Sequence, residues 1–209
     1  ITRPEQIISS IQQAIQVMLD PADCGPACIS LSQDVQGEVF EYPEDFFKER
    51  VHVIRRPKPD DYQIKEAAEL IKKSKKPLII SGGGVFYSDA TDELSSFATK
   101  HNIPVTQTVM GYSTMKKDHS HYLGAIGGLG GRAANNLSKE TDMAIAIGTK
   151  LADFTTGSWT NFENPDFKLV SINAARFDAN KHMAQAIVGD AKVSLMELSQ
   201  ALGNWKADD

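Results

Sequence analysis

The sequence predicts an α/β fold built on a doubly wound parallel sheet, and two observations support it. From residue 60 onward, short apolar segments alternate with amphipathic segments of about a dozen residues, which is the pattern of βαβ units. The run Met143–Gly148 is apolar throughout, as expected for a central strand that is buried on both faces. Right-handed crossovers would then place helices on both faces of the sheet.

The elements of this domain can be assigned in order. Asp60 or Asp61 can cap a first helix, whose inward residues recur at helical spacing. Asp190 is placed to cap the last helix. The sequence predicts strands at 77–81, 103–108, 143–148, 167–173 and 185–188, and further helices at 89–101, 131–139 and 191–202. We therefore expect one Rossmann-like domain over residues 61–205.

For residues 1–40 the sequence predicts only one helix and one strand. Ile7, Ile11, Ile15 and their neighbours have the spacing of an amphipathic helix over 4–19, and a short apolar strand is predicted at 27–31. One helix and one strand cannot bury a core of their own. We interpret this segment as the C-terminal remnant of another domain.

Residues 41–60 are interpreted as a linker. Prolines interrupt regular structure in this segment, and several lysines and arginines make it basic. Tyr42, Phe46 and Phe47 predict that the linker is anchored on a domain surface and is not free.

Composition excludes several function classes. A net charge of −5 argues against a nucleic-acid-binding protein, which usually presents a basic face. No apolar run approaches the roughly 18 residues that cross a bilayer. The chain begins with Ile and carries no signal peptide, so we expect that its natural N-terminus is absent and that it works in the cytoplasm. Cys24 and Cys28 could form a disulfide, but buried structural thiols are favoured in such a protein.

Three loops follow strand ends and are candidates for a binding site, because ligands of such sheets bind at the carboxyl ends of the strands. The first loop contains Gly82, Gly83 and Gly84. It could let a backbone approach an anion closely, or it could be a tight turn with positive φ angles. The residues alone leave both interpretations open.

The second loop spans 124–133. Gly128, Gly130 and Ala133 formally match the dinucleotide pattern G-x-G-x-x-[GA], but the strand before it, Tyr122–Leu123, is short. Arg132 at a helix start could still hold an anion. A packed loop is the favoured interpretation.

The third loop, 148–159, is rich in hydroxyl groups and includes Asp153, Thr155 and Thr156. Such a lining suits a polar ligand or a loop of a partner domain. Elsewhere, His119 and His121 form an H-x-H pair without a third ligand nearby, so no metal site is predicted. No nucleophile or metalloprotease motif occurs, and no catalytic residue can be named.

Several segments resemble a known family. Residues 25–36, GPACISLSQDVQ, resemble the last strand of the pyrimidine-binding domain of thiamine-diphosphate enzymes of the acetolactate synthase type. The later segments PLIISGGGV, IPVTQT, MAIAIGTKL and VGDAK are similar to landmarks of the central domain of these enzymes. A narrower resemblance, through 41–47, 54–60, 153–159 and 177–182, points to a hydrolase branch that acts in bacterial inositol catabolism.

The resemblance implies a longer enzyme that uses thiamine diphosphate and Mg²⁺ to hydrolyse a cyclic diketone to 5-deoxyglucuronate. The family's cofactor-activating glutamate would lie upstream, in the pyrimidine-binding domain. Its G-D-G…N motif would lie downstream, in the pyrophosphate-binding domain, and Gly189–Asp190 followed by Ala191 does not supply it. Both domains, and further subunits of a homo-oligomer, are therefore the implied partners, and neither nucleic acid nor a membrane is expected.

The resemblance places catalysis outside this chain, which would act as a scaffold. Acetolactate synthases carry FAD on the central domain, but FAD is not expected here. Two alternatives stay open: a central domain of an acetolactate synthase or glyoxylate carboligase relative, and a self-sufficient NAD- or FAD-binding module.

Overall fold

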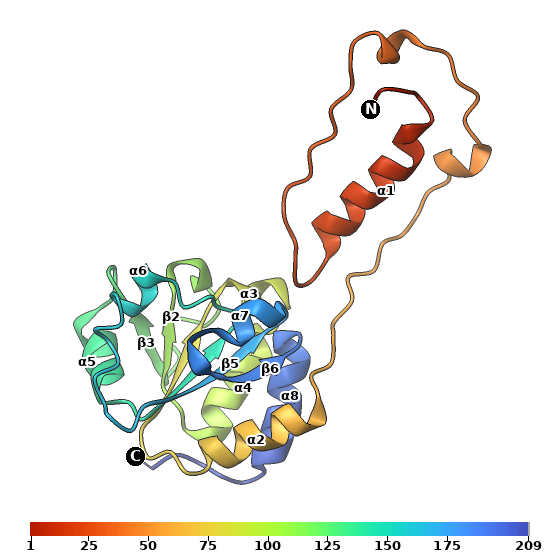
Figure 1. Cartoon of the computed structure of the whole chain (residues 1–209). Coiled ribbons are helices and arrows are strands. Elements are labelled where there is room, and N and C mark those ends of the chain that lie inside the picture. Colours follow the sequence, from red (N-terminus) through yellow and green to blue (C-terminus); the bar gives the residue numbers. More distant parts are fainter. Residues whose placement is uncertain (209) are drawn as a thin grey trace. The chain divides into compact units, whose positions relative to one another are not determined.

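The computed structural model describes residues 1–208, which form two compact units, one of residues 1–55 and one beginning at Arg56 (Figure 1). The first unit contains helix α1 (Gln6–Leu19) and two short 3₁₀ helices, η1 (Val35–Gly37) and η2 (Glu44–Phe47). Helix α1 has no buried residue. Within the described part of the first unit, only Pro4 and Val35 are buried, so this unit has almost no core.

The predicted strand at 27–31 does not form. These residues are not assigned to a strand, and the six strands found within residues 1–208 all lie in the second unit. A strand is stabilised by hydrogen bonds to a neighbouring strand, and the described residues of the first unit offer none. Instead, the amino group of Ile1 donates to the carbonyl oxygen of Ser30 at 2.7 Å.

A further expectation for the first unit needs correction. Cys24 and Cys28 are free and exposed, because a unit without a core has no interior to take up their thiols. The linker aromatics pack on one another within this unit: Tyr42 stacks on Phe46, with ring centres 5.4 Å apart, and Phe46 meets Phe47 edge-on at 5.2 Å. The Tyr42 hydroxyl also donates to the carbonyl oxygen of Pro4 at 3.4 Å, which ties the linker to the residues before α1.

The second unit is a six-stranded, fully parallel sheet with the strand order β3-β2-β1-β4-β5-β6, which confirms the predicted fold class. The pairing of β1 with β4 runs in register from Pro77 with Met143 to Ser81 with Ile147. The strands are β1 (Pro77–Ser81), β2 (Val105–Gln107), β3 (Tyr122–Ala125), β4 (Met143–Ile147), β5 (Lys168–Asn173) and β6 (Gln185–Val188).

Helices and long loops cover both faces of this sheet (Figure 1). One core cluster joins the sheet to the three long helices α2, α4 and α8, and a smaller one lies on the opposite face around Ile80, Ile126 and Leu169. The helices are α2 (Asp61–Ile71), α3 (Gly83–Tyr87), α4 (Thr91–His101), α5 (Arg132–Glu140), α6 (Asp153–Thr156), α7 (Arg176–Ala179) and α8 (Ala191–Leu202), with the 3₁₀ turns η3 (Val109–Gly111) and η4 (Lys181–Met183). The one-turn helices α3, α6 and α7 were not predicted, because single turns leave no periodic pattern.

Side-chain caps fix where α2 and α8 start. The Asp60 carboxylate accepts a hydrogen bond from the N–H of Tyr62 at 2.8 Å, and the Asp190 carboxylate accepts from the N–H groups of Lys192 and Val193. Each such cap contributes on the order of 1 kcal/mol. Both predicted caps are therefore confirmed. No helix within residues 1–208 is long and apolar enough to cross a membrane.

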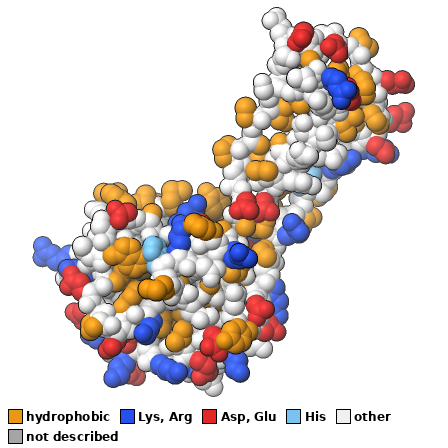
Figure 2. All heavy atoms as spheres, in the orientation of Figure 1, with side chains coloured by type: hydrophobic (Ala, Val, Ile, Leu, Met, Phe, Trp, Pro, Cys, Tyr) orange, Lys and Arg blue, Asp and Glu red, His pale blue; other side chains and the backbone are white. Residues whose placement is uncertain are grey.

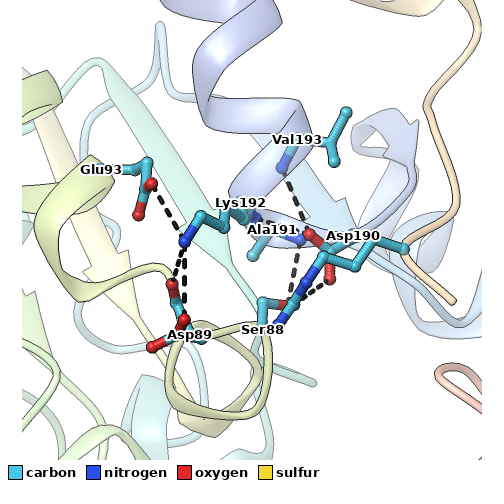
Figure 3. A network of polar contacts seen from close by, with 8 residues as sticks. Ser88, Asp89, Glu93, Asp190, Ala191, Lys192 and Val193 are labelled. Atoms are coloured by element: carbon cyan, nitrogen blue, oxygen red, sulfur yellow. Dashed lines mark hydrogen bonds and ion pairs between the residues drawn. The ribbon is translucent and has the colours of Figure 1, made fainter. Parts of the chain in front are cut away.

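A polar network holds the start of α8 (Figure 3). The guanidinium of Arg56 lies 3.1 Å from the carboxylate of Asp190, whose own N–H donates to the carbonyl oxygen of Pro57. Lys192 reaches toward Asp89 and Glu93, with nitrogen–oxygen distances of 3.5 and 3.3 Å. The network thus joins the first residues of this unit, the turn before α4 and α8.

Candidate functional site

The strand order places the expected ligand crevice between β1 and β4. The chain adds strands on one side of β1 through β2 and β3, and then returns to the other side through β4, β5 and β6. At such a switch point the loops leaving the two central strands diverge, and their carboxyl ends form the usual binding crevice. The candidates Gly82, Gly83 and Gly84 follow β1, and the loop 148–159 follows β4.

Backbone contacts close this crevice. The N–H of Gly82 donates to the carbonyl oxygen of Ile147 at 2.8 Å, and the N–H of Gly84 donates to that of Gly148 at 2.9 Å. A Cβ atom on Gly84 would lie 2.6 Å from the Cα of Gly148, and one on Gly82 would clash with the carbonyl oxygen of Gly148. The glycines therefore let two loops touch, and two of the N–H groups that an anion would need are already used.

The tight-turn interpretation of the first loop does not describe this arrangement. Gly82 has φ −113° and is the N-cap of α3, and the φ angles of Gly83 and Gly84 lie outside the left-handed region. The residue with left-handed backbone is Gly148, at φ +59°, on the opposite side of the contact. The tight-turn interpretation is thus wrong, and glycine is required here for close packing.

The second and third loops also meet. The N–H of Gly128 donates to the carbonyl oxygen of Phe154 at 2.9 Å, and Gly127, at φ +87°, leaves no room for a Cβ beside Phe154 and Thr155. The side chain of Asn135 fixes Gly127 by donating to its carbonyl oxygen and accepting from its N–H, at 3.0 and 2.9 Å. The glycine-rich loop is therefore packed, with β3 a four-residue strand before it.

The remaining candidate residues take different places. Arg132 is exposed at the first position of α5. Asp153 is exposed at the start of α6, where its carboxylate accepts from the Ser158 hydroxyl at 3.0 Å. Thr155 is half-buried, whereas Thr156 is fully buried and its hydroxyl accepts from the N–H of Trp159. The structure brings the three loops to one edge of the sheet, but their polar side chains are not gathered around one cavity.

A polar cluster at the end of β2 escaped the sequence prediction. The buried amide of Gln107 donates to the Thr114 hydroxyl at 3.3 Å and accepts from the Tyr122 hydroxyl at 3.2 Å, and Thr114 lies 2.7 Å from the Ser81 hydroxyl. The signal was present in the polar residues that end two of the predicted strands, Ser81 in one and 106–108 in the other.

A hollow of about 260 Å³ opens beside this cluster, lined by Gln107, Tyr112, Ser113, Met115, Lys116 and Lys117. The ammonium of Lys117 lies 5.3 Å from the centre of the Tyr112 ring. The hydrogen bond between the two side chains and the positive charge of Lys117 lower the pKa of the Tyr112 hydroxyl. The same hydrogen bond and the negative charge of ionised Tyr112 raise the pKa of Lys117. Among residues 1–208, no three His, Cys, Asp or Glu side chains are grouped so that they could hold a metal ion.

Comparison with known proteins gives a consistent result. The family model described as "Thiamine pyrophosphate enzyme, central domain" matches residues 64–198. A 3D-(3,5/4)-trihydroxycyclohexane-1,2-dione hydrolase of Clostridium perfringens (strain 13) is 46% identical over 202 residues, which is 97% of this chain and 32% of the relative. The Bacillus subtilis (strain 168) protein of the same name is 45% identical over 208 residues, 100% of this chain and 33% of the relative.

Solved structures show the same fold. Benzoylformate decarboxylase from Polynucleobacter necessarius superimposes with a TM-score of 0.76 at 22% identity, covering 100% of this chain and 38% of that one. A thiamin diphosphate-dependent enzyme from Mycobacterium smegmatis, described as putative, gives 0.76 at 21% identity. The chain thus spans about a third of the length of the curated relatives that it matches.

Proposed function

Because this chain belongs to the thiamine pyrophosphate enzyme family, as its central domain, we propose that it is the middle part of a longer ring-opening hydrolase. The substrate would be 3D-(3,5/4)-trihydroxycyclohexane-1,2-dione and the product 5-deoxyglucuronate, in the cytoplasmic degradation of myo-inositol. One observation supports this most: identity of 46% with the named hydrolase extends over 202 residues, well beyond the 64–198 segment shared with the whole family.

The described residues do not fit the family's cofactor. Thiamine diphosphate with Mg²⁺ needs a carboxylate-bearing metal site and free donors for a diphosphate. Residues 1–208 contain no metal-holding group of His, Cys, Asp or Glu, and the crevice is closed by Gly82, Gly84 and Gly148. We propose that the cofactor binds elsewhere in the longer enzyme, that FAD does not bind this domain, and that residues 61–205 act as a scaffold.

This proposal assigns the rest of the chain as well. Residues 1–40 would be the end of a pyrimidine-binding domain and 41–60 the linker to the central domain. The backbone at 27–31 supports this assignment, because it pairs with no strand of the described chain and could pair in the sheet of the domain that precedes it. The partners would be the enzyme's pyrimidine- and pyrophosphate-binding domains and further copies of the full-length subunit.

The full-length enzyme tests the function directly. We expect it to open the cyclic diketone in the presence of thiamine diphosphate and Mg²⁺, with activity lost after removal of either, and to leave pyruvate unchanged. Acetolactate formation from pyruvate would instead favour the acetolactate synthase alternative. Calorimetry on the 209-residue chain checks the cofactor assignment: we expect no heat of binding for thiamine diphosphate or FAD, and micromolar binding of either would contradict it.

A further inference from the structure

Large apolar side chains are exposed at the carboxyl edge of the sheet. They come from α3, which follows β1, and from the turn around η3, which follows β2. Hydrophobic side chains gather along the edge of this unit that carries α3 and α6 (Figure 2). We name five of them the apolar ledge, with exposed fractions in parentheses: Phe86 (62%), Tyr87 (75%), Val109 (52%), Met110 (70%) and Tyr112 (63%).

The two segments of the apolar ledge touch and are held in place. A Cβ atom on Gly83 would lie 3.0 Å from the carbonyl oxygen of Met110 and 3.5 Å from the ring of Tyr87, so α3 and η3 are in contact. The Thr108 hydroxyl accepts from the N–H of Gly111 at 3.0 Å, which fixes the η3 turn. The surface is therefore preformed and does not need to be ordered when a partner binds.

The apolar ledge is about as large as the largest apolar patch of a typical monomer. Its three aromatic rings, about two-thirds exposed, leave on the order of 400 Å² of side-chain surface in solvent. The largest patch of a typical monomer measures about 300–600 Å² and is often functional. By contrast, the exposed Tyr62 and Met196 stand singly on α2 and α8, as scattered surface residues do.

One border of the apolar ledge is basic. Tyr112 belongs both to the ledge and to the 260 Å³ hollow, whose other lining residues include Lys116 and Lys117. A partner that covers the ledge would therefore place an apolar surface on the rings and an acidic side chain near the two ammonium groups. Charge complementarity at a rim mainly sets orientation and rate of association.

We propose that the apolar ledge is the surface on which the remaining part of the longer enzyme docks. This rests on the function proposed above. The relatives carry about two-thirds of their length outside the segment that matches this chain, so a large body of the same polypeptide is available to cover it. About 400 Å² is half of one side of a standard interface, which suits a contact between domains of one chain.

Methionine oxidation in the full-length enzyme tests the proposal without using activity. Met110 lies on the apolar ledge and Met196 lies on α8, and their exposed fractions in this unit are similar, 70% and 59%. Both are followed by mass spectrometry after a brief hydrogen peroxide pulse, with the urea-unfolded enzyme as the reference. We expect Met110 to oxidise at least tenfold more slowly than Met196 in the folded enzyme, and equally fast in the unfolded enzyme.

Three other outcomes overturn the proposal, and a fourth separates it from the proposed function. Equal oxidation of the two methionines in the folded enzyme means that nothing docks on the ledge, even where the enzyme opens the diketone. Protection that appears only after FAD is added assigns the surface to a small ligand. Protection that the 209-residue chain shows by itself assigns it to this chain or, if protection grows with concentration, to a second copy. An enzyme inactive on the diketone but protected at Met110 contradicts the function and supports the docking surface.

Charge substitutions give a second test. In the full-length enzyme, M110K should lower the thermal midpoint more than the matched M196K does. M110K should also reduce the activity at least fivefold more than M196K. In the 209-residue chain both variants should unfold at the same urea concentration as the unchanged chain, because both side chains are already exposed. Equal effects of the two substitutions in the full-length enzyme would contradict the proposal.

Discussion

Both units of the chain contain an amphipathic helix, but the two units differ in how many residues that helix buries. Helix α1 has 14 residues and none of them is buried, whereas α2, with 11 residues, buries Ile64, Ala67, Ala68 and Ile71 against the sheet. An amphipathic pattern therefore predicts a helix but not the surface on which that helix packs. The second unit supplies a six-stranded sheet for its helices, and the described residues of the first supply no such surface.

Truncation of core side chains should show this difference most strongly. Leu94 on α4 is fully buried, so Leu94→Ala should lower the free energy of unfolding by about 3 kcal/mol. Met18 on α1 is 46% exposed, and Met18→Ala should change it by less than about 0.5 kcal/mol. Urea denaturation followed by circular dichroism measures both. Similar losses would mean that α1 is buried as deeply as α4.

Glycine substitutions extend the comparison to the backbone. Gly84→Ala should cost about 2 kcal/mol, because the new Cβ would lie 2.6 Å from the Cα of Gly148 and push the crevice open. Gly37 in the first unit has nothing within 4 Å of the position that a Cβ atom would take, so Gly37→Ala serves as the control with an expected change under about 0.5 kcal/mol. A neutral Gly84→Ala would show that the crevice is open.

Two aspartates, one in each unit, accept backbone hydrogen bonds over very different separations in sequence. Asp142 accepts from the N–H groups of Lys75 and Lys76, 67 and 66 residues away, and from the Ser74 hydroxyl. Asp20 accepts from Ala22 and Asp23, its near neighbours. Asp142→Asn should therefore cost about 1–2 kcal/mol of global stability, and Asp20→Asn much less.

The Asp142 carboxylate also predicts that the stability of the chain depends on pH in the acid range. Burial raises the pKa of Asp142, but the hydrogen bonds from Ser74, Lys75 and Lys76 outweigh it and the pKa is lowered overall. The unfolded chain then takes up the proton first. The contribution of Asp142 to the free energy of unfolding is complete above the ordinary aspartate pKa, near pH 4, and it is lost as the pH falls through the lowered pKa of the folded state. The free energy of unfolding, measured between pH 6 and pH 3, should therefore fall less with pH in Asp142→Asn than in the unchanged chain.

The smallest expected effect concerns His101 at the end of α4. Burial lowers the pKa of this imidazole, even though the hydrogen bond from Nδ1–H to the Trp205 carbonyl oxygen, at 2.7 Å, raises it. Below its ordinary value near 6.5 the unfolded state binds the proton and the folded state resists it, so stability falls on acidification from pH 7 to 5.5. We expect a loss of under about 1 kcal/mol, measured by urea denaturation and absent in His101→Gln.

Much of the fold could be predicted because its signals are local. A central parallel strand is buried on both faces, so the runs at 77–80 and 143–147 are apolar, and caps such as Asp190 follow from a single residue type at a helix start. The strand predicted at 27–31 was wrong because its apolar pattern is local but its pairing requires a neighbour that the described chain does not contain.

The site depended on contacts that no local pattern carries. Gly84 and Gly148 are in contact although 64 positions separate them in the sequence. The sequence alone therefore could not distinguish a glycine required for close packing from one required for a turn. The hollow beside Gln107 likewise depends on where η3 folds back over β1 and β2. The exposed ring of Tyr112 could not be distinguished from a buried one, because exposure is a property of the assembled edge.

The prolines beside the Arg56–Asp190 contact also set where a protease can enter. Lys48, Arg50, Arg55 and Arg56 are exposed, but the peptide bond after Arg56 leads into Pro57, where trypsin does not cleave. Lys58 likewise precedes Pro59. Brief digestion should therefore trim the chain to a resistant fragment that begins at Arg56, with the network around α8 intact as its first structural element.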